Sequence, residues 1–259
     1  MSGPSSAADP ATRFSDRVAD YAKYRPSYPA EAIDAIVRVT GLSAGATVAD
    51  VGAGTGLSAR PFLERGFRVI AVEPNDAMRA AADAWLGAFP GYASRAGTAE
   101  RTGLRDASVA LAIAAQAFHW FRKDEARVEL ARVVAPPRWV AVLWNERLVD
   151  TPFLRDYEAA LHAHAIDYDK VDHRNVDRET IARFFGGDFE TLSFPNTQRF
   201  DRAGFFGRVL SSSYVPNEGH PKHEAMMAAL ARIWDERQTD GAVEFRYLTL
   251  VHVGMLRAP

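Results

Sequence analysis

The chain has 259 residues, of which 47% are hydrophobic and 25% charged, and its formal net charge at pH 7 is −2. This composition is typical of a globular protein, and the length suits one α/β domain with insertions. The absence of cysteine excludes disulfides, thiolate nucleophiles and cysteine-ligated metal sites. With a negative net charge and no run of Lys and Arg, the chain lacks the basic surface that phosphate binding needs, so we expect no nucleic acid partner.

Neither an export signal nor a membrane-spanning segment is expected from the sequence. Residues 1–12 are rich in Ser, Ala and Pro and lack an apolar signal core, so we interpret them as a disordered lead-in. The longest apolar run near the middle of the chain, Val109–Ala115, is far shorter than the roughly 20 residues that cross a bilayer. We therefore expect a cytoplasmic protein with no membrane partner, and a single domain over residues 13–259.

Helical and strand-like patterns alternate from about residue 29 to residue 145, which is typical of a mostly parallel sheet with helices on its faces. The first helix is predicted to have Pro29 at its N1 position and to end at Gly41. A later helix is capped by Asn75 or Asp76. Its predicted apolar face consists of Met78, Ala82 and Trp85. The other predicted elements are strands at 47–51, 68–72, 108–114 and 139–143 and helices at 57–65 and 124–134.

The remainder of the chain, residues 146–259, has a different pattern. Residues 151–185, 201–211 and 223–237 are predicted to be helical. Residues 189–200 are predicted to be a strand interrupted at Pro195–Asn196, and residues 243–253 form a closing strand. Helices between the late strands of such a sheet commonly cover the ligand-binding end, so we interpret them as a cap.

A glycine-rich turn follows the first predicted strand, from Asp50 to Gly56. Glycine tolerates a positive φ and lets a ligand lie against the backbone, beyond the carboxyl end of a parallel strand. The spacing is G-x-G-x-G, with Leu57 where a dinucleotide-binding turn has Gly or Ala, which weakens the interpretation as a pyrophosphate site. Glu73 ends the second strand where an acid can accept hydrogen bonds from ribose hydroxyls. Both NAD and S-adenosylmethionine contain that ribose, so Glu73 does not choose between them.

Several motifs together resemble a known family. Residues 48–56 resemble the first motif of class I S-adenosylmethionine-dependent methyltransferases, and residues 72–75, 97–100 and 116–121 are similar to their later motifs. Residues 13–29, with Tyr24-Arg25-Pro26, resemble the N-terminal segment of the trans-aconitate methyltransferase-like subfamily. The resemblance covers residues 13 to about 145, whereas the cap matches only loosely at residues 211–214. It implies a Rossmann-like, mostly parallel seven-stranded sheet with helices on both faces and a helical cap inserted among the late strands.

The resemblance also implies a cofactor, S-adenosylmethionine, with S-adenosylhomocysteine as the product, and a role for each matching residue. Asp50 and Gly52 would border the methionine portion, Gly54 and Gly56 would admit the ligand, and Glu73 would hold the ribose. The other implied cofactor residues are Ala53 in the turn, Pro74 or Met78 against the adenine, Thr98, Ala99 and Glu100 along its opposite edge, and Gln116 and Ala117 near the methionine. One departure from the family is the segment 135–138, Ala-Pro-Pro-Arg in place of Pro-Gly-Gly, whose two prolines cannot supply a positive φ.

The acceptor side offers fewer signals. His119 follows the fourth strand and titrates near neutral pH, so it is the leading candidate for a catalytic or substrate-orienting residue, with a place in the pocket wall as the alternative. The segment around residues 21–28, here called the strap, is expected to cross the cofactor, with Tyr24 against it and Arg25 meeting a carboxylate. His162 and His164 point to different sides of a helix, so no metal site is predicted.

These observations predict a methyltransferase that acts on a small molecule by direct methyl displacement. The acceptor is an organic acid carboxylate or an oxygen or nitrogen atom of a natural product. The alternatives are a non-catalytic S-adenosylmethionine-binding regulator or partner subunit, because fold alone never establishes chemistry, and an NAD-dependent oxidoreductase. We expect a monomer or a homodimer.

Overall fold

The computed structural model describes residues 23–166, 168 and 176–257, and the segments 1–12 and 13–22 named above lie outside them. Seven strands form one sheet in the order β3-β2-β1-β4-β5-β7-β6. They are β1 (Thr47–Val51), β2 (Arg68–Val72), β3 (Tyr92–Arg95), β4 (Val109–Ala115), β5 (Val134–Arg147), β6 (Phe189–Phe200) and β7 (Val243–Met255). All neighbouring pairs from β3 to β5 are parallel, whereas β7 is antiparallel to both β5 and β6. This is the mostly parallel, seven-stranded sheet that the sequence predicts.

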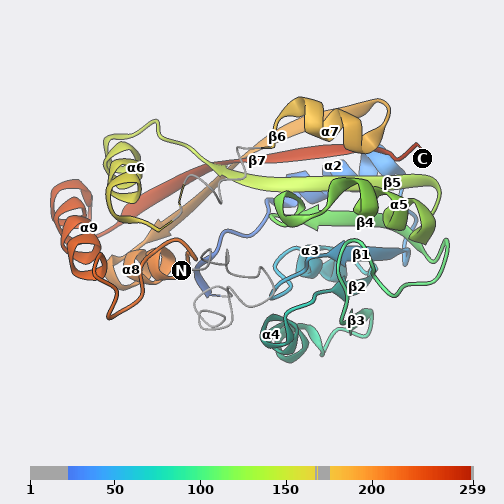
Figure 1. Cartoon of the computed structure of the whole chain (residues 1–259), viewed down its shortest axis with the longest axis horizontal. Helices are drawn as coiled ribbons and strands as arrows, with labels where there is room; N and C mark the ends of the chain where they lie inside the picture. The colour runs from blue at the N-terminus through green and yellow to red at the C-terminus, as the bar shows by residue number, and fades with distance from the viewer. Residues whose placement is uncertain (1–22, 167, 169–175, 258–259) are drawn as a thin grey trace, which may run out of the picture.

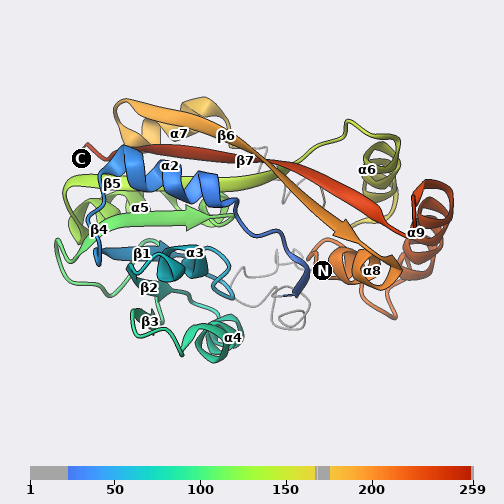
Figure 2. The same ribbon diagram turned by 180° about the vertical axis from the view of Figure 1, so that it is seen from behind.

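The helices form two groups (Figure 1). Those beside the sheet are α2 (Ala30–Thr40), α3 (Ala59–Glu64), α4 (Asp76–Leu86), α5 (Lys123–Val133) and α7 (Arg178–Phe185). Helices α2 and α3 lie on one face, and α5 and α7 lie on the other (Figures 1 and 2). The cap consists of α6 (Pro152–His164), α8 (Arg202–Leu210) and α9 (His223–Arg237), and a short 3₁₀ helix, η2 (Phe118–Trp120), follows β4.

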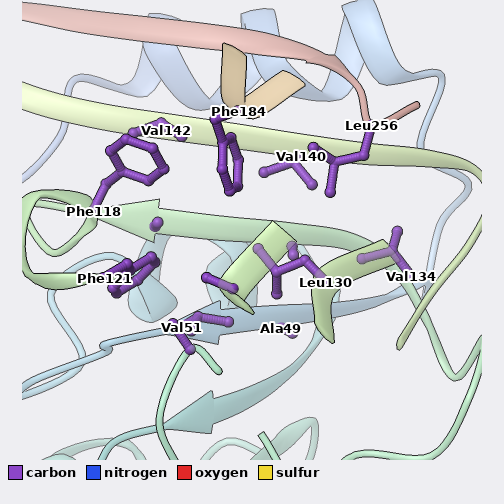
Figure 3. Close-up of a cluster of buried hydrophobic side chains, with 14 of the residues drawn as sticks. Ala49, Val51, Phe118, Phe121, Leu130, Val134, Val140, Val142, Phe184 and Leu256 are labelled. Atoms are coloured by element: carbon purple, nitrogen blue, oxygen red, sulfur yellow. The ribbon is translucent and has the colours of Figure 1, made fainter. Parts of the chain in front are cut away.

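The central strands are buried on both faces, as expected for a parallel sheet covered by helices. Ala49 and Val51 of β1 pack with α5 and α7 in one apolar cluster (Figure 3), whereas Val48 joins the cluster under α2 and α3. Burial of apolar side chains contributes roughly 25 cal/mol per Å², so these two layers supply most of the drive for folding the sheet. The order of strands reverses direction between β1 and β4, which places the expected ligand crevice at the carboxyl ends of these two strands.

The cap has its own apolar core. Strands β5, β6 and β7 extend well beyond the rest of the sheet, and α6, α8 and α9 pack around their far ends (Figures 1 and 2). Tyr157, Phe205 and Phe245 are fully buried at the centre of this cluster. The cap is therefore a continuation of the sheet's last strands and not a separate sheet.

Local signals explain most element boundaries. Gly41 ends α2 in the left-handed conformation, as expected for a helix C-terminus. Pro29 is the N-cap of α2, one position earlier than the predicted N1. The side chain of Asn75 accepts a hydrogen bond from the Met78 N–H and caps α4. The predicted ranges 47–51, 68–72 and 223–237 match β1, β2 and α9 to the residue.

Several sequence-based predictions are wrong in detail. The short edge strand β3 was not predicted, and Trp85 lies 37% exposed beside Arg60 instead of on the apolar face of α4. Pro195 does not interrupt β6, because β6 is an edge strand and proline is tolerated there. Within residues 151–185, which are predicted to be helical, the described residues contain helices α6 and α7, and the predicted helix 57–65 is the shorter α3. The segment 135–138 lies within the long β5, where Arg138 takes the positive φ of 68° that proline cannot.

Candidate active site

A cavity of about 420 Å³ extends from the glycine turn at the end of β1 to the inner surface of the cap. Its walls come from the glycine turn, the ends of β2, β4 and β5, the strap and the cap. This volume is in the range of small-molecule sites, about 300–1,000 Å³. The cavity therefore joins the predicted cofactor site to the cap in one continuous space.

The three glycines of the turn have different environments, although all have a positive φ of 73°, 56° and 86° at Gly52, Gly54 and Gly56. A Cβ atom on Gly52 would lie 2.6 Å from the Ala117 Cβ, and one on Gly56 would lie 2.4 Å from Leu86 Cδ1. A Cβ atom on Gly54 would meet nothing within 4 Å, and Gly54 lines the cavity together with Ala53. Gly52 lines the cavity as well, but Gly54 is the glycine whose missing side chain leaves open space beside the backbone. Gly56 does not line the cavity, and its small size serves packing against α4.

Glu73 joins the end of β2 to the glycine turn. Its Oε2 accepts a hydrogen bond of 2.8 Å from the Gly54 N–H, and its Oε1 accepts one of 2.9 Å from the Asn75 N–H. Burial raises the pKa of Glu73, although both backbone N–H groups oppose this rise. Each oxygen keeps a second acceptor position. Glu73 lines the cavity and can therefore accept hydrogen bonds from the hydroxyls of a ribose.

Asp50 lies beneath the turn and does not line the cavity. Its Oδ2 accepts a 2.6 Å hydrogen bond from the hydroxyl of Ser58, which does line the cavity, whereas its Oδ1 is buried with no partner among the described residues. Burial raises the pKa of Asp50 to about 7, against the opposing effect of the Ser58 hydrogen bond. A buried, unsatisfied carboxylate oxygen is costly, so this atom indicates a position that a donor is built to reach.

The predicted adenine-binding residues come together along one side of the cavity. Pro74, Met78, Thr98, Ala99 and Glu100 all line it. Met78 and Ala99 are almost fully buried, which suits an apolar slot for a flat ring. Hydrogen bonds from the Arg122 N–H and Thr98, with the Arg122 charge, outweigh the effect of burial and lower the pKa of Glu100.

The segment after β4 forms another wall. Gln116, in the left-handed region at φ 55°, donates from Nε2 to the Asn145 carbonyl across 3.3 Å. Gln116, Ala117 and His119 line the cavity, and the Ala117 methyl group faces Gly52. His119 belongs to η2, and its backbone carbonyl accepts a hydrogen bond from Lys123 Nζ. Because it lines the cavity, His119 can contact an acceptor, and its catalytic role stays a prediction.

The strap forms part of the cavity wall, though not as the sequence suggests. Arg25, Pro26 and Tyr28 line the cavity, whereas Tyr24 does not. The Tyr24 ring instead packs edge-on against Phe200 of β6 and lies over Gly207 of α8. The prediction that Tyr24 lies against the cofactor thus finds no support in its position. Tyr21 lies outside the described residues.

Apart from Tyr214, whose aromatic side chain in the cap suggests a place in a substrate cavity, the sequence does not indicate which residues form the cap side of the cavity. We call it the acceptor wall, and it consists of Arg147, Tyr168, Arg208, Tyr214 and Tyr247. One feature of the sequence could have indicated Arg208. It is a charged residue, yet it lies three positions after Phe205, on the apolar face of its helix. Phe205 and Trp234, two large aromatic residues of the cap helices, belong to the cap core instead.

Two buried arginines of the acceptor wall differ in their partners. Arg147 pairs with Glu158 and donates to the Tyr168 hydroxyl across 2.8 Å. Arg208 is 3% exposed and, among the described residues, donates only to neutral oxygens, the Tyr247 hydroxyl at 3.2 Å and the Ser212 hydroxyl at 3.0 Å. Among the described residues no acidic side chain pairs with it.

The same charges act on Tyr214, a partly buried tyrosine of this wall. Burial alone would raise the pKa of Tyr214, but the positive charges of Arg147, Arg208 and Arg25 outweigh it and lower that pKa to about 8. The acceptor wall therefore carries a net positive field in a low-dielectric setting, which favours an anion.

Comparison with known proteins fits this geometry. The Methyltransferase domain family matches residues 49–142, from β1 into β5. An uncharacterized methyltransferase of Schizosaccharomyces pombe is 32% identical over 246 residues, which cover 92% of this chain and 95% of that protein. The chain belongs to the class I S-adenosylmethionine-dependent methyltransferases. An uncharacterized methyltransferase of Mycobacterium tuberculosis is 39% identical over 139 residues, and this match spans only 54% of each protein.

Solved structures of other methyltransferases share the fold. One from Anaeromyxobacter dehalogenans, provisionally named a type II methyltransferase, has a TM-score of 0.68 at 24% identity and covers 91% of this chain and 100% of its own. A phosphoethanolamine N-methyltransferase from Haemonchus contortus, in complex with S-adenosylmethionine, has a TM-score of 0.57 at 12% identity, over 96% of this chain and 59% of its own. At these identities the likeness shows the fold alone.

The methyltransferase's own residues fit S-adenosylmethionine. Gly54 leaves open the space that a side chain would fill, Glu73 offers acceptors to a ribose, and the unpartnered Oδ1 of Asp50 lies buried beneath the same turn. Pro74, Met78 and Ala99 form the apolar slot that an adenine needs. When bound, this cofactor supplies a methyl group on a positively charged sulfur.

Two further predictions concern metals and membranes. His162 lies 3.6 Å from the Glu158 carboxylate, and no group of three metal-binding side chains is found in the parts of the chain that the structure covers. Asp167, Asp169, Asp172 and His173 lie outside the described residues. Within 23–166, 168 and 176–257, no helix combines the length and apolar character needed to cross a membrane.

Proposed function

We propose that this methyltransferase transfers the methyl group of S-adenosylmethionine to the carboxylate of a small organic acid held in the cavity. The observation that carries this proposal is Arg208, a buried guanidinium on the acceptor wall that no acid neutralises among the described residues. Leaving a charge unpaired in the interior costs several kcal/mol in the usual case. A carboxylate ligand would offset that cost and bind through charge-assisted hydrogen bonds.

The chemistry asks little of the protein beyond alignment. A carboxylate already has the electron pair that attacks the methyl carbon, so a C–O bond forms as the C–S bond breaks and no proton has to move. Alignment of this kind can be worth effective molarities of about 10⁵ M or more. Arg208 and Tyr247 would hold the acid from the cap, and His119 would orient it from the opposite wall.

A hydroxyl acceptor is the second candidate, because one observation favours it. The pKa of Tyr214 is lowered to about 8 by the surrounding arginines, and a tyrosinate on the acceptor wall could take a proton from a hydroxyl. If Tyr214 acts as the base, the rate of methylation would rise with pH through about 8. The rate of methylation of a carboxylate would instead stay constant above the pKa of the acid.

Three further expectations complete the proposal. The volume of the cavity and the absence of a basic stretch support a small molecule as partner, without nucleic acid or membrane. We propose that the protein is a cytoplasmic monomer or homodimer and that it belongs to the trans-aconitate methyltransferase-like subfamily. A non-catalytic regulator that binds S-adenosylmethionine is the alternative to an enzyme.

The test uses cofactor labelled in its methyl group and a fraction of small organic acids. We expect calorimetry to detect binding of S-adenosylhomocysteine and labelled product to accumulate. Mild alkali should release the label as volatile methanol, because esters hydrolyse and methyl ethers do not. Alkali-stable label would favour the hydroxyl acceptor, and binding without any transfer would favour the regulator.

A further inference from the structure

The described part of the strap, residues 23–28, is held in place by side chains of the late strands. Gln198 of β6 donates from Nε2 to the Tyr24 carbonyl across 3.1 Å. Asn196, two residues earlier, donates to the Ser27 carbonyl across 2.8 Å, and Asn145 of β5 donates to the same carbonyl across 3.2 Å. These contacts fix the backbone of the segment whose next residues line the cofactor cavity.

Helix α8 provides a seat for the Tyr24 ring. A Cβ atom on Gly207 would lie 2.2 Å from Tyr24 Cε2 and 2.4 Å from its Cζ, far inside van der Waals contact. Glycine inside a helix lowers helix stability relative to alanine. Gly207 therefore leaves space that the Tyr24 ring occupies. The next residue along the helix is Arg208, which lines the cavity from the acceptor wall.

A chain of hydrogen bonds also joins the strap to Arg208. Arg208 Nε donates to the Tyr247 hydroxyl across 3.2 Å, and that hydroxyl donates to Gln198 Oε1 across 3.2 Å. The amide of Gln198 thus uses its oxygen toward the acceptor wall and its nitrogen toward the strap. The orientation of the Gln198 side chain therefore depends on the acceptor wall and on the strap at the same time.

We propose that Gln198 and Gly207 hold the strap closed over the cofactor and that Tyr247 links this closure to Arg208, so that cofactor release is controlled from the acceptor wall. Gln198 and Gly207 are positioning residues in this account, since neither lines the cavity, whereas Tyr247 lines it and joins the two sides. The inference rests on the proposed function in that the cavity must bind the cofactor. Coupling between two sites is reciprocal, so a change on the acceptor side must alter cofactor binding.

The first test measures the dissociation rate of S-adenosylhomocysteine from the full chain, by displacement with excess S-adenosylmethionine. Tyr247→Phe removes only the hydroxyl that orients Gln198, and Gln198→Leu removes the amide itself. Since a single hydrogen bond is worth about 0.5–1.5 kcal/mol, we expect release to become roughly 3- to 10-fold faster in each variant. The double variant should be no faster than Gln198→Leu alone, because both act through one contact.

The matched control is Tyr157→Phe. Tyr157 is a buried cap tyrosine whose hydroxyl has no hydrogen-bond partner among the described residues, and it does not line the cavity. This variant makes the same chemical change in the same core as Tyr247→Phe. We expect it to leave the release rate unchanged, and an equal acceleration would mean that loosening of the cap explains both.

A second variant keeps the proposal testable should Tyr247→Phe fold poorly. Gly207→Ala improves helix propensity, so α8 should not unfold, yet its methyl group must displace the Tyr24 ring. We expect faster release here as well, and no additional acceleration from Gly207→Ala once Tyr24→Ala has removed the ring. Wild-type rates in Tyr247→Phe, Gln198→Leu and Gly207→Ala, with normal affinity in the wild type, would overturn this inference alone. A wild-type chain that binds neither cofactor form would overturn the proposed function as well.

Discussion

The Gly54 N–H donates to the Glu73 carboxylate across 2.8 Å, so the residue expected to hold the ribose also fixes the glycine turn. The second oxygen of the same carboxylate accepts from the Asn75 N–H at the start of α4. One side chain thus sets the relative positions of the turn after β1 and the loop after β2. Such preorganisation lowers the ordering cost that binding would otherwise carry.

We predict that Glu73→Gln weakens binding of S-adenosylhomocysteine by about 10- to 100-fold. The amide nitrogen would face a backbone N–H that now donates to the carboxylate, and one such donor would stay unsatisfied at a cost of roughly 1–3 kcal/mol. Calorimetry measures the affinity, and urea unfolding measures the stability. Glu190→Gln, an exposed change on β6, is the control and should alter neither. Wild-type affinity in Glu73→Gln would remove Glu73 from the site.

Gly54→Ala and Gly66→Ala separate backbone strain from ligand space. Both glycines have a positive φ, 56° and 78°, and neither has an atom within 4 Å of a Cβ built on it. Alanine at either position should lower stability by about 1–2 kcal/mol through the same left-handed strain. Only Gly54 lines the cavity, so only Gly54→Ala should weaken S-adenosylhomocysteine binding by more than about 10-fold, as measured by calorimetry. Equal affinities in the two variants would show that the turn does not contact the ligand.

The cofactor half of the site could be predicted from the sequence because its residues follow strand ends. Buried strands such as β1 and β2 are bounded by clear turn signals, and the carboxyl ends of parallel strands meet at one edge. Glu73 and Gly54 are therefore brought together by register alone, across the paired strands β1 and β2. Their mutual hydrogen bond could not be predicted, since it depends on the conformation of both loops.

The acceptor half could not be predicted because it depends on how far three strands extend. Arg147 and Tyr247 face each other only through the antiparallel register of β5 and β7, well beyond the last parallel strand. The orientation of Tyr24 likewise depends on Gly207, which is distant in sequence. Strand β3 was missed for another reason, because its four half-exposed residues form too short a pattern to recognise.

Asp50 should make the stability of the ligand-free protein depend on pH. Burial raises its pKa to about 7, against about 3.9 in an unfolded chain. The protonated carboxyl group of Asp50 stabilises the folded protein relative to the unfolded chain. This stabilisation is complete below the pKa of Asp50 in the unfolded chain and is lost as pH rises through its pKa in the folded protein. The free energy of unfolding should therefore fall by up to about 1.4 kcal/mol per pH unit between roughly pH 5 and 7.

Asp50→Asn should abolish the part of the pH dependence of the free energy of unfolding that Asp50 contributes. The asparagine Oδ1 can still accept from Ser58, and no ionisation is possible. The stability of Asp50→Asn relative to wild type should therefore be greater at pH 8 than at pH 5, by about 2–3 kcal/mol in urea unfolding. The exposed Asp235→Asn provides the control for charge alone. Parallel curves for wild type and Asp50→Asn would mean that Asp50 is ionised throughout.

Arg208→Gln should separate acceptor binding from folding. With the acid identified by methyl transfer, we expect its KM to rise by about 10- to 100-fold, since charge-assisted hydrogen bonds are worth roughly 1.5–3 kcal/mol. The melting temperature of the ligand-free chain should not fall, because the substitution removes a buried charge that lacks an acidic partner among the described residues. Arg202→Gln, at the exposed start of the same helix, should leave KM unchanged. A lower melting temperature with an unchanged KM would make Arg208 a structural residue of the cap, and the acceptor would then need no negative charge.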